Sequence, residues 1–168
     1  MRKGFSVIEL LMVIATILII TAIAVPNLLR LRLLANEASA VASIHAINAA
    51  ETAYASTYPE VGYVELSSLG GSAGTSTAAN LIDSLLASGS KNGYSFRVGV
   101  LSTTAPASAY VLNGDPVNSL DGQRHFYSDQ SGVIRYNNTT QADMWDVPLA
   151  GTRPPAGGRS ADNGPPPQ

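Results

Sequence analysis

The sequence has no cysteine among its 168 residues. Disulfide bonds and thiolate metal sites are therefore excluded, and the fold must be held by packing, by hydrogen bonds or by a bound ion. The chain has only two histidines, His45 and His125, and two isolated imidazoles support neither a zinc site nor a Ser/His/Asp arrangement. Because no nucleophile can be paired with a base, we expect a protein that is not an enzyme.

Charge is also scarce. Only 13% of the residues are charged, the formal net charge is −2, and the basic residues form no block. A mildly acidic surface of this kind argues against nucleic acid as a partner. The composition instead fits a membrane anchor followed by one small polar domain.

One long apolar run occupies residues 5–29. As a helix these residues would rise about 37 Å at ~1.5 Å each, which is enough to cross a hydrocarbon core of roughly 30 Å with some tilt. A secretory signal peptide would end its apolar core earlier and close with small residues, so this run is a better membrane span than a signal. Arg2 and Lys3 favour a cytoplasmic N-terminus, while Arg30 and Arg32 at the other end weaken that preference.

The run carries one acid, Glu9. A carboxylate inside hydrocarbon costs on the order of 2.5–3.5 kcal/mol on insertion scales, so its presence calls for a partner or a function. Pro26 lies near the other end of the run, where its missing N–H predicts a bend or local melting of a helix over residues 21–26.

The segment Arg2-Lys3-Gly4-Phe5-Ser6-Val7-Ile8-Glu9-Leu10-Leu11, together with Pro26, closely resembles the start of type IV pilin and pseudopilin precursors. The resemblance implies a leader of residues 1–4, cleavage after Gly4 by a prepilin peptidase, and N-methylation of the new terminus, Phe5. It also implies that Glu9 pairs with the terminal ammonium of a neighbouring subunit and so sets the register of a homopolymer. An assembly ATPase and an inner-membrane platform protein would then be partners, and membrane lipid would surround the subunit before assembly. Many pilins close a C-terminal loop with a disulfide, and this chain departs from them.

The rest of the chain predicts an α+β fold, in which a long helical spine packs on a small antiparallel sheet. Residues 5–29 would form the transmembrane and polymerisation half of the spine. Residues 30–58 would form an amphipathic half that buries Leu34, Val41, Ile44, Ile47, Tyr54 and Tyr58. Pro59 would end the helix.

Residues 59–92 are rich in Gly, Ser and Thr and predict a surface loop with one short helix at residues 78–87. Residues 93–147 predict the sheet of a globular head, with three or four strands at residues 94–100, 109–113, 123–128 and 132–137. Strict alternation places Tyr94, Phe96 and Val98 on the face toward the helix. Residues 148–168, rich in Pro and Gly, predict a flexible tail.

Two features of the head allow a further interpretation. Asp115, Asp121 and Asp129 could supply oxygen ligands to calcium, although Asp-Gly and Asp-Pro pairs are also what ordinary turns use. Pseudopilins of type II secretion are known for a calcium-stabilised loop near the sheet. Trp145 is expected to pack over an edge of the sheet.

The resemblance therefore implies a structural subunit of a type IV pilus, held in the inner membrane as a precursor and extracellular once assembled. A pseudopilin in a periplasmic filament of a type II secretion system is the first alternative. A minor pilin that displays an adhesive or DNA-binding head is the second.

Overall fold

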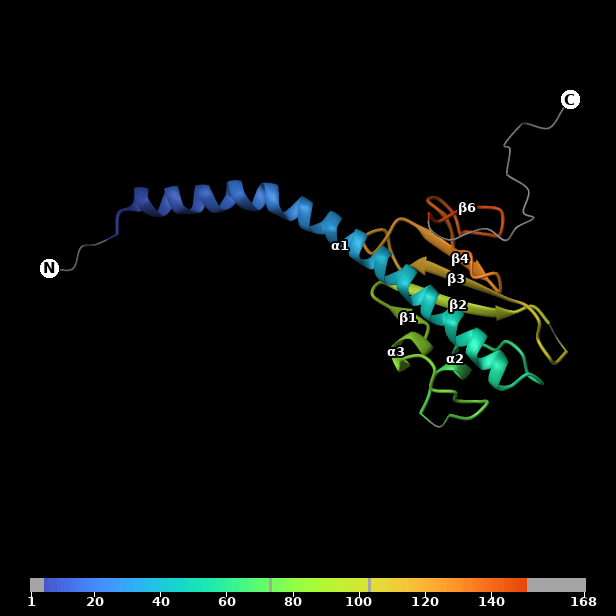
Figure 1. Ribbon diagram of the computed structural model, residues 1–168. Coiled ribbons are helices and arrows are strands. Elements are labelled where there is room, and N and C mark those ends of the chain that lie inside the picture. Colours follow the sequence, from blue (N-terminus) through green and yellow to red (C-terminus); the bar gives the residue numbers. More distant parts are fainter. Residues whose placement is uncertain (1–4, 73, 103, 151–168) are drawn as a thin grey trace, which may run out of the picture.

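The computed structural model describes residues 5–72, 74–102 and 104–150, and it has the predicted α+β architecture. One long helix, α1 (Val7–Thr57), packs its C-terminal half across a six-stranded antiparallel sheet. Its N-terminal half extends away from the head (Figure 1). The predicted tail lies mostly in residues 151–168, which are outside the described residues.

Helix α1 agrees with its prediction to within two residues at either end. Ser6 is the N-cap residue and Tyr58 the C-cap residue, and Pro59 follows where a helix cannot easily continue. The helix runs unbroken through Pro26, and its ribbon curves gently in this part of the chain (Figure 1). The expected bend is therefore present without local melting.

The sheet is a simple meander in which each strand pairs with the next along the chain. It has six strands, two more than the largest number predicted, because strands of two residues leave no periodicity to read. The strands are β1 (Ser90–Lys91), β2 (Tyr94–Val100), β3 (Tyr110–Pro116), β4 (His125–Asp129), β5 (Arg135–Asn137) and β6 (Val147–Pro148).

The core lies between α1 and one face of the sheet. Tyr94 and Phe96 on β2 are buried against the helix and Val98 is half-buried on the same core, as the alternation predicted. Gly114 on β3 permits the close packing, because a Cβ at this position would lie 3.3 Å from Ile44 and 3.2 Å from Phe96. The helix contributes Ala40, Ile44, Ile47, Ala50 and Tyr54 to this core.

The segment between the helix and the sheet is more than a surface loop, which corrects the prediction for residues 59–92. It forms α2 (Leu66–Leu69) and α3 (Ser84–Ala87), and it contributes Leu66, Leu69, Ile82 and Leu86 to the core. The helix expected at residues 78–87 begins only at Ser84. Asp83 caps it by accepting a hydrogen bond from the Leu86 backbone N–H at 2.9 Å.

Polar groups occupy part of the helix face that was expected to be apolar. Glu37, Asn48 and Glu51 are all buried, whereas Leu34, predicted to be buried, is 50% exposed. Glu37 and Glu51 lie seven residues on either side of Ile44, so one helical stripe carries both core and acidic side chains. Glu37 and Asn48 have hydrogen-bond partners on the head, whereas one carboxylate oxygen of Glu51 has none.

Candidate assembly surface and the helix-to-head junction

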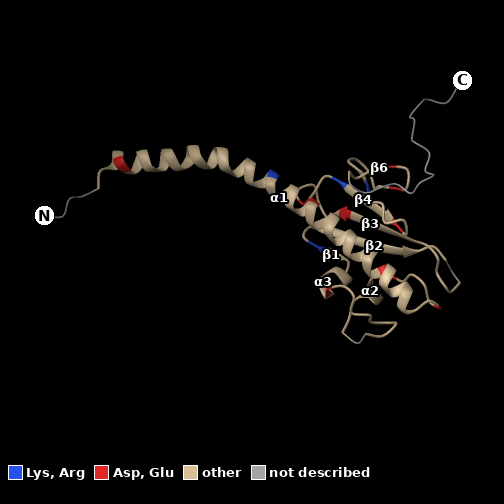
Figure 2. Cartoon of the chain, viewed as in Figure 1, with Lys and Arg blue, Asp and Glu red and all other residues tan. Residues whose placement is uncertain are grey.

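The N-terminal half of α1 presents an apolar surface that no other described part of the chain covers. Every residue from 5 to 32 is exposed, and no Asp, Glu, Lys or Arg occurs between Glu9 and Arg30. Figure 2 shows this uncharged stretch between the acid near the start of the helix and the first cation. By length and composition α1 is able to cross a membrane. So large an apolar surface indicates contact with lipid or with other protein chains.

Hydroxyl groups within this half are satisfied by the helix itself. The side chain of Thr16 donates to the Met12 carbonyl oxygen at 2.9 Å, and that of Thr21 donates to the Ile17 carbonyl oxygen. These bonds satisfy two hydroxyl donors within the helix, so the threonines need no other partner in an apolar environment.

Glu9 lies in the first turn of α1, where its carboxylate accepts a hydrogen bond from the Ser6 backbone N–H at 2.9 Å. This contact satisfies the backbone N–H of the N-cap residue itself, and a negative charge is favourable at that end of the helix dipole. Phe5 is 76% exposed beside it. Gly4 and the rest of the predicted leader, residues 1–4, lie outside the described residues.

The three acids predicted to bind calcium do not come together. Asp129 pairs in register with Val111 on β3, so it lies four residues along the strand from Asp115, about 13 Å away. Asp121 accepts from the Asn118 side chain, and Asp129 accepts from the Ser131 backbone N–H at 2.8 Å. Within the described part of the chain, no three His, Cys, Asp or Glu side chains are grouped to hold a metal. The predicted calcium site is therefore wrong, and the loop and turn role that competed with it fits these bonds.

A polar clamp joins α1 to the head at the point where the helix leaves it. The carboxylate of Glu37, 7% exposed, accepts hydrogen bonds from the backbone N–H groups of Gln123 at 3.1 Å and Arg124 at 3.4 Å. Its other oxygen forms an ion pair with Nε of Arg124 at 2.9 Å. Asn36 adds a bond from its side chain to the Asp121 carbonyl oxygen at 2.9 Å. These contacts fix the loop of residues 117–124 on the helix.

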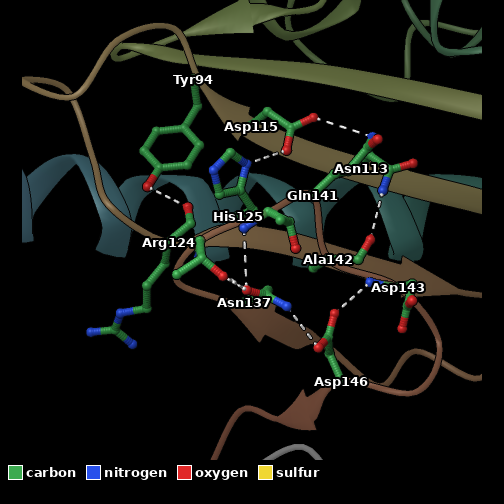
Figure 3. A network of polar contacts seen from close by, with 12 residues as sticks. Tyr94, Asn113, Asp115, Arg124, His125, Asn137, Gln141, Ala142, Asp143 and Asp146 are labelled. Carbon is green, nitrogen blue, oxygen red and sulfur yellow. Dashed lines mark hydrogen bonds and ion pairs between the residues drawn. The ribbon is translucent and has the colours of Figure 1, made fainter.

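Tyr94 supports the clamp from the sheet side. Its hydroxyl donates to the Arg124 carbonyl oxygen at 2.9 Å (Figure 3). A Cβ at Gly122 would lie only 2.1 Å from that hydroxyl, so the loop can approach the tyrosine only with glycine here. The clamp was not predictable from the sequence, because its two halves lie more than 80 residues apart along the chain. The one available signal was the position of Glu37 on the Ile44 stripe.

The second face of the sheet is partly covered by residues 138–149. Asn113 donates to the Ala142 carbonyl oxygen at 3.3 Å, and Gln141 donates to Asp115 at 3.4 Å (Figure 3). Asp115 also pairs with Nδ1 of His125 at 2.7 Å. Ala142 is 3% exposed as a result. These bonds hold the segment in a chain that has no disulfide.

Asp146 anchors the returning end of the same segment. Its carboxylate accepts from the Asn137 side chain at 2.9 Å, and its carbonyl oxygen accepts from Arg135 at 3.1 Å. The β5–β6 pair and a backbone bond from Leu149 to Ile134 at 2.7 Å complete the closure. Trp145 was predicted to pack over an edge of the sheet, and that prediction is wrong. It is 79% exposed, because its turn is held by the polar bonds of its neighbours.

Glu51 is the most deeply buried acid among the described residues. It is fully buried, one carboxylate oxygen accepts from the Val64 backbone N–H at 3.2 Å, and the other has no hydrogen-bond partner. Burial raises the pKa of Glu51 to about 7, against the smaller opposing effect of the Val64 hydrogen bond. Its charge state therefore changes near neutral pH.

Comparisons with known proteins give no relative for this chain. No protein-family model, no curated protein and no solved structure matches it.

Proposed function

We propose that this chain is a structural subunit of a type IV pilin-like filament, anchored in a membrane through α1 before assembly. The observation that carries the proposal is the bare apolar half of α1, which extends from a folded head and carries its one acid in the first turn. The same surface would contact lipid in the free subunit and neighbouring helices in the filament. Its role would be mechanical, with no catalytic step.

The position of Glu9 supports the proposed maturation. Cleavage after Gly4 would place the new ammonium on Phe5, one residue before the backbone N–H that already donates to the Glu9 carboxylate. The carboxylate is therefore oriented toward the end of the helix where the new charge would arise. In a bundle of parallel helices the same group would be able to accept the ammonium of a neighbour, and an unpaired acid in that apolar environment would be costly.

A periplasmic pseudopilus remains the alternative within the same class, because it would use the same helix in the same way. A calcium-binding loop formed by Asp115, Asp121 and Asp129 would have favoured the pseudopilus. These three side chains are not grouped to hold a metal within the described residues. An adhesive or DNA-binding head is not favoured by any described contact.

Mass spectrometry of filaments sheared from the cell surface tests the proposal. We expect an abundant N-terminal peptide that begins at Phe5 with a methylated amine. A processed chain found only in the cell envelope would support the pseudopilus or a minor subunit. A chain that keeps residues 1–4 in every fraction would contradict the proposal.

Glu9→Gln tests the role of the acid directly. The substitution preserves size and hydrogen-bonding capacity but removes the charge, so membrane insertion and leader cleavage should persist while filament yield falls. Glu60→Gln, at an exposed position beyond the helix, is the matched control. A normal filament yield from the Glu9 variant would refute the proposed pairing.

A further inference from the structure

A cleft of about 520 Å³ opens where α1 leaves the head. Arg30, Leu33 and Leu34 line it from the helix, and Gln123 and Arg124 line it from the clamped loop. The cleft thus combines two guanidinium groups with two leucine side chains. The two guanidinium groups match an anionic group such as a phosphate.

The cleft begins where the apolar run ends. Residue 29 is the last of the run, and Arg30 follows it directly. Glu37, at the far end of the cleft, lies seven residues farther, about 10 Å along the helix axis. Headgroups extend roughly 5–7 Å beyond each side of the hydrocarbon core. A helix that spans the bilayer with residues 5–29 therefore brings the Arg30 end of the cleft to headgroup depth, and Glu37 lies beyond that layer.

The charge of the cleft is positive. Glu37 offsets one cation through its ion pair with Nε of Arg124. Arg30 adds a second cation from the helix, and Arg32 lies nearby outside the cleft lining. In Figure 3 the Arg124 side chain points away from the polar network of the sheet. Its guanidinium lies 5.5 Å from the Tyr136 ring centroid, which restricts its orientation.

Exposed apolar side chains accompany the cleft on the clamped loop. Leu120 is 72% exposed and Val117 is 61% exposed. Asp121, next to Leu120, is bonded to Asn36 on α1, so this loop lies at the end of the head from which the apolar half of the helix extends. Apolar side chains beside cations are typical of surfaces that rest on a bilayer interface.

We propose that this cleft binds the phosphate of an anionic phospholipid, with Arg30 and Arg124 as the ligands and the acyl chains running back along the apolar residues that precede Arg30. The inference rests on the proposed membrane anchoring of α1. The bound lipid holds the head of the unassembled subunit against the bilayer surface. Entry into a filament then requires exchange of this phosphate for contacts with other subunits, which makes extraction sensitive to lipid composition.

The test uses the full-length chain, purified in a mild nonionic detergent and titrated with phosphatidylglycerol or phosphatidylcholine under native mass spectrometry. We expect phosphatidylglycerol to bind more tightly. One arginine near a membrane surface contributes about fivefold in affinity for anionic lipid, so Arg30→Gln should reduce the preference about fivefold. Arg30 is exposed on the helix, and its replacement leaves the Glu37–Arg124 ion pair in place.

Two control variants separate a specific cleft from general surface attraction. Arg32→Gln removes the same charge near the same depth but outside the cleft lining, and Arg97→Gln removes an exposed charge on β2. Both should keep most of the preference. Equal losses from Arg30→Gln and Arg32→Gln, or equal affinity of the native chain for the two lipids, would overturn the cleft proposal.

Reconstitution into phosphatidylcholine nanodiscs separates this inference from the proposed function. If the chain inserts normally but shows no lipid preference in detergent, only the cleft proposal is overturned. If the chain fails to insert, the proposal of a membrane anchor is overturned as well. Inorganic phosphate at millimolar concentration should not displace the lipid, and full displacement would show that the site takes free phosphate rather than a headgroup.

Discussion

The buried carboxylate of Glu51 makes the stability of the head depend on pH in an unusual direction. Its pKa is about 7 in the folded chain, against 4.5 for the ordinary value, because burial disfavours the charge. The folded state thus binds more protons than the unfolded state between these two values. The free energy of unfolding therefore falls as the pH rises through this window and levels off above about pH 7.

The size of the effect follows from the shift. Two and a half units at 1.36 kcal/mol each give about 3 kcal/mol over the whole window, and about 2 kcal/mol of this falls between pH 5.5 and pH 8.5. Glu51→Gln cannot ionise and keeps an oxygen for the Val64 N–H. The variant should therefore lose this pH dependence of the free energy of unfolding. Between pH 5.5 and pH 8.5 its free energy of unfolding should rise by about 2 kcal/mol relative to that of the native chain.

Urea unfolding of the full-length chain in a nonionic detergent measures this difference. Near-ultraviolet circular dichroism reports the packed rings of Tyr54, Tyr94 and Tyr110, which are all buried in the core. Glu60→Gln, an exposed acid in the following turn, is the control, and it shares every other titrating group with the native chain. If Glu51→Gln kept the native pH dependence between pH 5.5 and 8.5, the assignment to this carboxylate would be refuted.

Three further predictions concern the packing of the core and the anchoring of residues 138–146. Gly114→Ala should lower the free energy of unfolding by about 1–3 kcal/mol, because the new methyl group presses on the helix and on Phe96, and denaturant midpoints measure this loss. Asn48→Ala should cost about 1–3 kcal/mol in the same assay, because the buried Tyr110 hydroxyl loses its acceptor at 2.9 Å, whereas Thr52→Ala removes only a bond within the helix. Asn137→Ala should leave the core intact and speed proteolysis of residues 138–146, and unchanged cleavage rates would contradict the anchoring role of Asp146.

Local signals predicted the parts of the fold that depend on neighbours in sequence. The bounds of α1 follow from apolar and alanine-rich residues that end at Pro59, and the strict alternation of β2 fixed both its limits and its buried face. Strands β1 and β6 were missed because two residues carry no pattern, and their existence depends on the longer strands beside them. Trp145 was misplaced for a related reason, since a large aromatic side chain predicts burial only if the fold provides a surface for it.

The candidate sites also differ in this way: a site within one element was predictable, and a site built from distant segments was not. The apolar surface with Glu9 was predictable because every part of it lies within one helix. The clamp between Glu37 and Arg124 was not, because a carboxylate on an otherwise apolar stripe indicates a partner without identifying it. The calcium prediction failed because Asp115 and Asp129 occupy strand positions four residues apart in register, which spacing along the chain does not reveal.

The two outermost strands have a consequence for crowding. Both β1 and β6 are only two residues long, and β6 ends in Pro148, which has no N–H to offer a further strand. Long, flat outer strands would allow neighbouring heads to join into a continuous sheet when many copies are concentrated together. The two-residue strands β1 and β6 offer few backbone groups for such pairing, so contacts between concentrated heads would form mainly through side chains.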